Sequence, residues 1–265
     1  MEVVSDMTAS CFLAALKRFV SRRGCPAKIY CDNGTNFVRG NKDLLNLKEK
    51  FENQFEHDLI YNFYLQNSIN FHFNPPTGSH FGGLFEAVVK STKFHLKRVV
   101  GDQNLTFEEA TTLLTQIEAI LNSRPLCTIP SNDPDTFESL TPAHFLIGRS
   151  STAILEPNIL DSSTNRLSKW ENIQKRVQGF WKIWSKDYLH TLQQRYKWKH
   201  KEDNIKLGDI VLLKEDNLPP TKLALARVEI VHPGEDKLVR VVTIKTSSQK
   251  LLKRPITKLI KLPIE

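Results

Sequence analysis

Hydrophobic positions in the first half of the chain change between helical and strand-like spacing. Apolar residues recur every three to four positions in three segments that predict amphipathic helices: Thr8–Val20, Asp43 to about Leu65, and Leu84–Val100. Between them, Lys28–Cys31 and the alternating Ile69–Phe73 predict short strands, and Glu2–Val4 has the pattern of the end of another strand. This order of helices and strands predicts an α/β sheet.

Two further segments follow this α/β part. Thr106-Phe107-Glu108-Glu109 predicts a helix start with an acidic first turn, running to Leu121. Residues 126–166 are rich in Pro, Ser, Thr and Asn, which predicts an extended connector. Thr141–Gly148 is expected to form one short helix inside it.

The last hundred residues change pattern twice. From Ser168 a helical stripe carries Trp170, Ile173, Val177, Phe180, Trp181, Trp184 and Tyr188, which is more typical of a core or docking face than of a ligand site. After Lys206 the pattern predicts short strands with turns between them: Asp209–Leu213, Ala226–Val231, Leu238–Thr243 and Gln249–Lys253. Four or five short strands of this kind favour a small β-barrel. The pattern therefore divides the chain into residues 1–125, 126–166, 167–200 and 201–265.

Composition excludes several classes of protein. An apolar content of 40% with 25% charged residues is ordinary for a folded chain of 265 residues. No apolar run approaches 18 residues, and the start lacks the features of a secretory signal, so we expect no membrane partner. Four cysteines without metal-ligand spacing fit reduced thiols in an intracellular protein.

Charge is unevenly distributed along the chain. Residues 1–164 hold 15 Lys and Arg against 18 Asp and Glu, a net charge of −3. Residues 165–265 hold 22 against 11, a net charge of +11. A basic C-terminal third is typical of a polyanion-binding module. A basic surface that serves only solubility would give the same charge distribution.

Two carboxylates have contexts that suit chemistry. Asp32 follows a predicted strand and precedes Asn33-Gly34, which by itself indicates a turn. Glu86 follows Gly82-Gly83 in the first turn of a predicted helix, where the helix dipole favours an acid. Together, a carboxylate at a strand end and another on a nearby helix can converge on Mg²⁺, which prefers oxygen ligands. Two such ions would catalyse phosphodiester chemistry, but they need a third carboxylate.

Three lysines follow Glu86 on its own helical face. Lys90, Lys93 and Lys97 lie four, seven and eleven positions further on. They predict either a solvated cationic face, with Glu86 and Lys90 as a helix pair, or a row that follows a phosphate backbone.

The order of these motifs resembles a known family. Asp32-Asn-Gly-Thr-Asn-Phe and Asn74-Pro-Pro-x-x-x-His80-Phe-Gly-Gly-Leu-Phe-Glu86 resemble the integrase core of retroelements. Three downstream segments are similar to those of Pao/BEL-class LTR retrotransposon polyproteins: Leu121–Leu126, Leu140–Gly148 and Leu207–Lys214. The resemblance covers nearly the whole chain.

The resemblance implies a fold and an activity. It implies a ribonuclease H-like core over residues 1–125, a helical linker, and a small SH3-like β-barrel. In that family an Asp, Asp, Glu triad binds Mg²⁺ or Mn²⁺ and joins element ends to target DNA, so Asp32 would be the second acid and Glu86 the third. Lys90, Lys93 and Lys97, with Lys253 and Arg254 in the barrel, would contact DNA. Action on DNA implies a nuclear location and a possible homo-oligomer.

The chain also departs from the family pattern. The family pattern places its first catalytic Asp and a zinc-binding domain upstream of the segment with which this sequence opens, and Asp6 is expected to be a poor substitute for that ligand. The missing first strand would leave Glu2–Val4 to pair with Lys28–Cys31 directly, or to stay unpaired. We therefore expect an integrase-related chain that is inactive by itself. A non-catalytic DNA- or RNA-binding or domesticated interaction protein, or a longer protein that carries the missing strands, are the alternatives.

Overall fold

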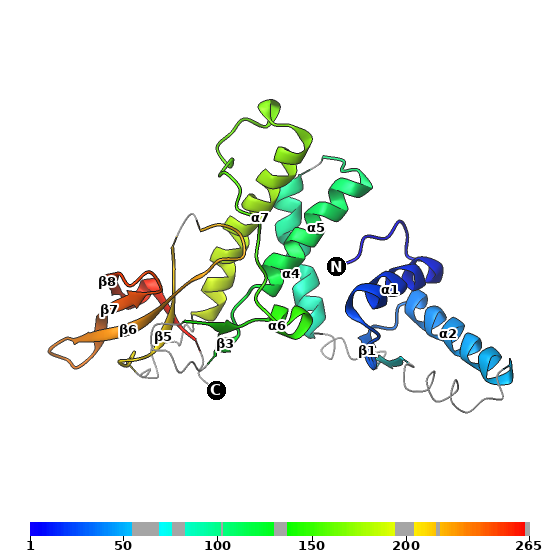
Figure 1. Ribbon diagram of the computed structural model, residues 1–265, viewed down its shortest axis with the longest axis horizontal. Helices are drawn as coiled ribbons and strands as arrows, with labels where there is room; N and C mark the ends of the chain where they lie inside the picture. Colours follow the sequence, from blue (N-terminus) through cyan, green and yellow to red (C-terminus); the bar gives the residue numbers. More distant parts are fainter. Residues whose placement is uncertain are drawn as a thin grey trace. The chain divides into compact units, whose positions relative to one another are not determined.

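The computed structural model describes residues 1–54, 69–75, 83–101, 103–129, 137–193, 204–215 and 218–262. The chain divides into two units, Met1–Lys97 and Arg98–Glu265, with mixed α/β content and the elements shown in Figure 1. Over the described residues, no helix combines the length and the apolar character needed to cross a membrane.

The first unit is built around two short parallel strands. Its elements are α1 (Ala9–Arg23), β1 (Lys28–Cys31), α2 (Thr35–Gln54), β2 (Asn70–Phe73) and most of α4 (Gly83–Val100). β1 pairs with β2 from Lys28 opposite Asn70 to Cys31 opposite Phe73. Parallel strands need a long crossover, and α2 lies in the connection between these two. The strands predicted at Lys28–Cys31 and Ile69–Phe73 are therefore confirmed.

Aromatic rings join α1 and α2 to the strands. The Phe12 ring of α1 lies edge-on to Phe37 of α2, with ring centroids 4.9 Å apart, and 6.2 Å from the ring of Phe71 on β2. Gly40 lets α2 approach closely, because a Cβ atom there would lie 2.5 Å from Phe12 Cδ1. This packing fixes the helices that flank the end of β1.

Two predictions for this unit were wrong in detail. Glu2–Val4 forms no strand; Glu2 instead pairs with Arg18 and Arg22 on α1, and Arg18 also donates to the Val3 carbonyl. α2 begins at Thr35 rather than Asp43, and the part of the predicted helix beyond residue 54 lies outside the described residues.

The second unit begins with helices. They are α5 (Phe107–Asn122), α6 (Pro142–Ile147) and α7 (Lys169–Leu192), with the two-residue strands β3 (Cys127–Thr128) and β4 (Ser139–Leu140) and the 3₁₀ turn η2 (Thr164–Arg166) between them. Capping boxes start both long helices: Thr106 with Glu109 on α5, and Ser168 with Glu171 on α7. Each box satisfies two backbone N–H groups that the helix leaves free, and this explains where the helices begin.

The aromatic stripe of α7 is core. Phe180, Trp181 and Trp184 are buried, and the ring of Trp184 stacks on Tyr188 at 5.1 Å. The Tyr188 hydroxyl donates to the Pro125 carbonyl at 2.7 Å, and burial raises the pKa of Tyr188. The predicted packing role of this stripe is confirmed for Ile173, Val177, Phe180, Trp181 and Trp184, whereas Trp170 is half exposed.

The remainder of the unit is a curled antiparallel sheet, which forms a half-barrel (Figure 1). Its strand order is β8-β7-β6-β5-β9, and η3 (Ile256–Lys258) connects β8 to β9. The strands are β5 (Ile210–Leu213), β6 (Ala224–Pro233), β7 (Val239–Thr246), β8 (Leu251–Pro255) and β9 (Leu259–Lys261). Two register shifts between β6 and β7 help the sheet to bend. The four predicted strands are confirmed, and β9 is a fifth.

α7 and the half-barrel share a hydrophobic cluster. Leu189 near the end of α7 packs with Leu212 of β5, Ile260 of β9 and the adjoining Leu262. All four side chains are at most 5% exposed. α7 therefore packs directly on the sheet.

Candidate nucleic-acid and metal site

Asp32 lies immediately after β1, in a tight turn. Its Oδ1 accepts a hydrogen bond from the Gly34 backbone N–H at 2.9 Å, and α2 begins at the next residue. The carboxylate is exposed, and Oδ2 has no partner among the described residues. The turn expected from Asp-Asn-Gly is therefore present, and it holds the carboxylate at the strand end with one oxygen available.

A second contact fixes this turn against the end of β2. The Asn33 side chain donates to the Asn74 carbonyl, and the Asn74 N–H donates to the Cys31 carbonyl at 3.0 Å. Cys31 is buried, and desolvation together with the charge of Asp32 raises the pKa of its thiol. The two parallel strands therefore end together, with Asp32 at that edge.

Glu86 and the three lysines of α4 form an exposed row. Glu86 lies in the first turn of the helix, and Lys90, Lys93 and Lys97 are exposed like it. Buried positions of α4 fall on the other side, at Thr92 and His95. The helix therefore presents one acidic and three basic side chains along one face, as the periodicity predicts.

The described residues do not complete a metal site. Asp32 and Glu86 have the oxygen donors that Mg²⁺ or Mn²⁺ takes. No described contact joins the two carboxylates, and no group of three or more His, Cys, Asp or Glu side chains in the described ranges could hold an ion. Their assignment as metal ligands stays a prediction, and no reaction step is derived through a metal.

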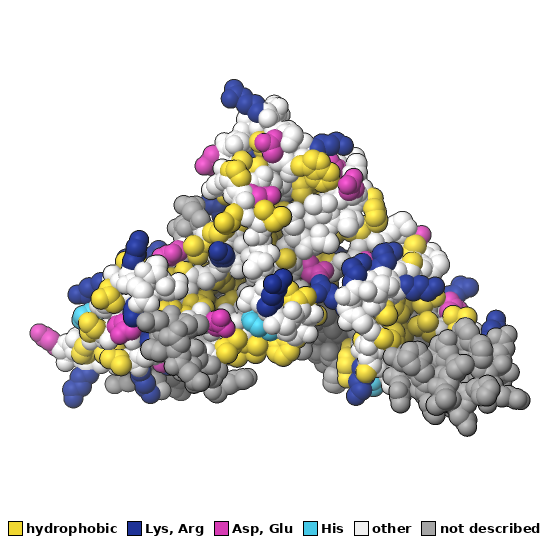
Figure 2. All heavy atoms as spheres, in the orientation of Figure 1, with side chains coloured by type: hydrophobic (Ala, Val, Ile, Leu, Met, Phe, Trp, Pro, Cys, Tyr) yellow, Lys and Arg dark blue, Asp and Glu magenta, His cyan; other side chains and the backbone are white. Residues whose placement is uncertain are grey.

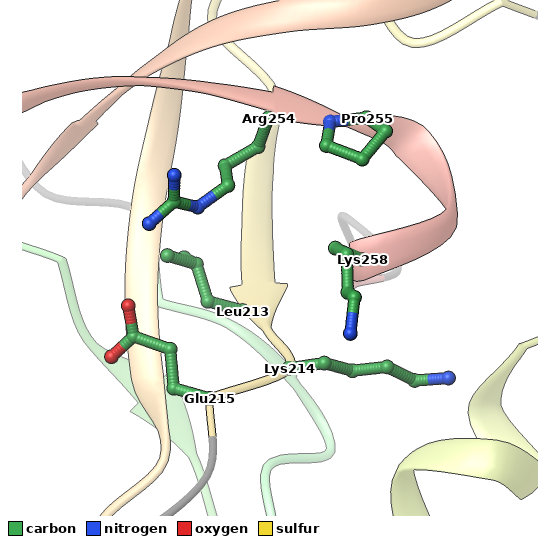
Figure 3. Close-up of a pocket in the computed structure, with 6 residues that line it drawn as sticks. All are labelled: Leu213, Lys214, Glu215, Arg254, Pro255 and Lys258. Carbon is green, nitrogen blue, oxygen red and sulfur yellow. The ribbon is translucent and has the colours of Figure 1, made fainter.

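The two predicted basic residues of the barrel lie on opposite faces of β8. Side chains alternate along a strand, and Lys253 is exposed whereas Arg254 is half-buried. Arg254 lines a pocket with Lys214 and Lys258, two cations that no sequence pattern places beside it (Figure 3). Lys253 and Arg254 therefore cannot contact the same phosphate.

Other cations of the half-barrel are dispersed. Figure 2 shows Lys and Arg side chains scattered over its visible face rather than gathered into one patch. Some are neutralised locally: Arg240 donates from both terminal nitrogens to Asp236, and this lowers the pKa of Asp236 to about 2. Net charge alone therefore does not locate a binding surface.

Comparison with known proteins gives a family match to part of the chain and likenesses to solved structures. Residues 168–262 match the "Family of unknown function (DUF5641)". No curated protein matches the chain. A chain in the cryo-EM structure of the simian T-cell lymphotropic virus intasome in complex with PP2A regulatory subunit B56 gamma is similar at 12% sequence identity and a TM-score of 0.32. The likeness covers 97% of this chain and 65% of that one.

The family match begins and ends where α7 and the half-barrel that it packs on begin and end. It begins at Ser168, the N-cap of α7, and ends at Leu262, which belongs to the cluster between α7 and the half-barrel. The region that matches is therefore the helix together with the sheet that it packs on.

Proposed function

We propose that this chain is a nucleic-acid-binding protein related to retroelement integrases. The observation that carries the proposal is the exposed row of Lys90, Lys93 and Lys97, which begins one turn after Glu86 in the motif that resembles the integrase core. Cations spaced along one helical face suit the regular negative charge of a phosphate backbone. The basic C-terminal third, with a net charge of +11, would add to the same attraction.

Salt dependence tests this proposal. We expect the full chain to bind a DNA duplex with an affinity that falls steeply with salt, because each phosphate that a cation neutralises releases counterions. Replacing Lys90, Lys93 and Lys97 with glutamine should reduce the slope of log affinity against log salt by roughly one for each lysine that binds a phosphate. Fluorescence anisotropy with a labelled duplex at several salt concentrations measures both.

A matched variant separates direct phosphate binding from net charge. Lys17, Lys42 and Lys50 are also exposed in the first unit, and their replacement with glutamine removes the same charge. This control should leave the salt slope unchanged. Equal slopes for the two triple variants would refute a role for the α4 row, and a wild-type affinity indifferent to salt would refute nucleic-acid binding.

Metal-dependent strand transfer is the second candidate function. The position of Asp32 favours it, since an exposed carboxylate fixed at a strand end is suited to hold an ion. With only Asp32 and Glu86 assigned, we expect no joined product from this chain alone with Mg²⁺ or Mn²⁺.

A strand-joining assay on labelled DNA ends decides between the two. A joined product that disappears in Asp32→Asn and persists in Asp43→Asn, a neighbouring acid on α2, would establish catalysis by this chain. Its absence in wild type would leave binding as the function of the isolated chain.

A further inference from the structure

The pocket beside Arg254 lies where the curled sheet brings non-neighbouring strands together. It has a volume of about 320 Å³. Its lining comes from the end of β5 and from the passage of β8 into η3: Leu213, Lys214, Glu215, Arg254, Pro255 and Lys258 (Figure 3). β5 and β8 are separated by two strands in the sheet order, so the curl places these residues side by side.

Backbone pairing fixes the positions of two of the cations. Leu213 pairs with Leu259, and the Lys214 N–H donates to the Lys258 carbonyl at 2.9 Å. The Gln193 side chain bridges the same region, since its oxygen accepts from Lys214 Nζ at 2.6 Å and its nitrogen donates to the Thr257 carbonyl at 3.0 Å. Lys214 is therefore held by α7's C-cap residue, which leaves Arg254 and Lys258 as the cations available to a ligand.

The pocket has an excess of positive charge. Three cations and the single acid Glu215 line it, which gives a formal charge of +2. Figure 3 shows the Arg254 guanidinium and the Glu215 carboxylate on the same side of the pocket, yet no ion pair within 4.0 Å joins them among the described residues. The one described hydrogen bond of the guanidinium is a long one, 3.4 Å from Nη1 to the Lys253 carbonyl. Donors of Arg254 therefore remain for an external acceptor.

We propose that this pocket binds one phosphodiester group of a polynucleotide, with Arg254 and Lys258 as the donors. The inference rests on the proposed nucleic-acid binding and names the site at which the half-barrel takes part. A planar guanidinium binds two oxygens of one phosphate at once, and the long Lys258 side chain, on the other side of the pocket in Figure 3, can add a second charge-assisted bond. The exposed Pro255 ring supplies an apolar surface suited to sugar carbons.

Substitution of the two proposed donors tests the site. We expect Arg254→Gln and Lys258→Gln each to weaken binding of the full chain to a labelled duplex on the order of tenfold, the effect of one charge-assisted hydrogen bond. Each should also lower the salt slope by about one. Lys250→Gln is the matched control, because it removes one charge from an exposed side chain of the half-barrel that does not line the pocket, and it should change binding much less.

The outcomes separate this inference from the proposed function. If wild type binds with a steep salt dependence but Lys250→Gln loses as much as Arg254→Gln and Lys258→Gln, the pocket is refuted and nucleic-acid binding stands. If wild type does not bind the duplex, both are refuted. Circular dichroism and thermal melting check that the variants fold. If Arg254→Gln does not fold, Lys258→Gln provides the test, because the Lys258 side chain is exposed.

Discussion

Replacing Phe180 with alanine is expected to lower the free energy of unfolding of the second unit by about 3–5 kcal/mol. Phe180 is 0% exposed and lies in the middle of α7, among the buried positions that face the rest of that unit. Truncation would remove the apolar surface of the ring and leave a cavity that well-packed neighbours cannot fill. Urea unfolding followed by tryptophan fluorescence reports on this region, because Trp181 and Trp184 are adjacent in α7.

Phe145 provides the matched control for Phe180. It undergoes the same chemical change in the same unit, but its side chain is 74% exposed on α6. Phe145→Ala should therefore change the free energy of unfolding by no more than about 0.5 kcal/mol. Similar losses in the two variants would show that α7 does not carry the core of this unit.

The same packing indicates how the matched family region works as a unit. α7 contributes Leu189 to the cluster with Leu212 and Ile260, so loss of the helix would expose one side of the half-barrel. Gln193, directly after α7, also holds Lys214 at the edge of the proposed phosphate pocket. Stability and the candidate binding site of this region therefore depend on the same helix.

Sequence signals between residues close together in the chain predicted the helix starts best. Ser168 with Glu171, and Thr106 with Glu109, form the capping boxes that start two of the long helices, and these depend on residues three apart. The start of α2 was missed because it depends on distant contacts. Phe37 packs on Phe12 of another helix, and no local period shows that.

The candidate site was predictable only in part for the same reason. The strand–turn context placed Asp32 at the end of β1, and periodicity placed Glu86 and its lysines on one face. The approach of Lys214 and Lys258 to Arg254 could not be read from the sequence, because it depends on the curl of the sheet and on strand β9. Whether Asp32 and Glu86 serve one metal is likewise a question of tertiary contacts, and that assignment stays a prediction.

Asparagine in place of Asp209 is expected to lower the free energy of unfolding of the same unit by about 2 kcal/mol. Asp209 is 5% exposed, and its Oδ2 accepts from both Lys261 Nζ and the Lys206 backbone N–H at 2.8 Å. The substitution removes the charge that pairs β9 with the start of β5, and it can place an amide donor against other donors. The effect should stay below that of a fully buried pair, because the Lys261 side chain is 42% exposed.

Asp236→Asn is the matched control for this prediction. Asp236 also pairs with a cation in the half-barrel, Arg240, but both side chains are exposed, so its loss should change stability little. Urea unfolding in low and in high salt compares the two variants. The cost of Asp209→Asn should persist in high salt, since a buried pair is screened less than an exposed one. If the two substitutions have equal effects, or if high salt abolishes that of Asp209→Asn, the Asp209–Lys261 pair does not hold β9 onto the sheet.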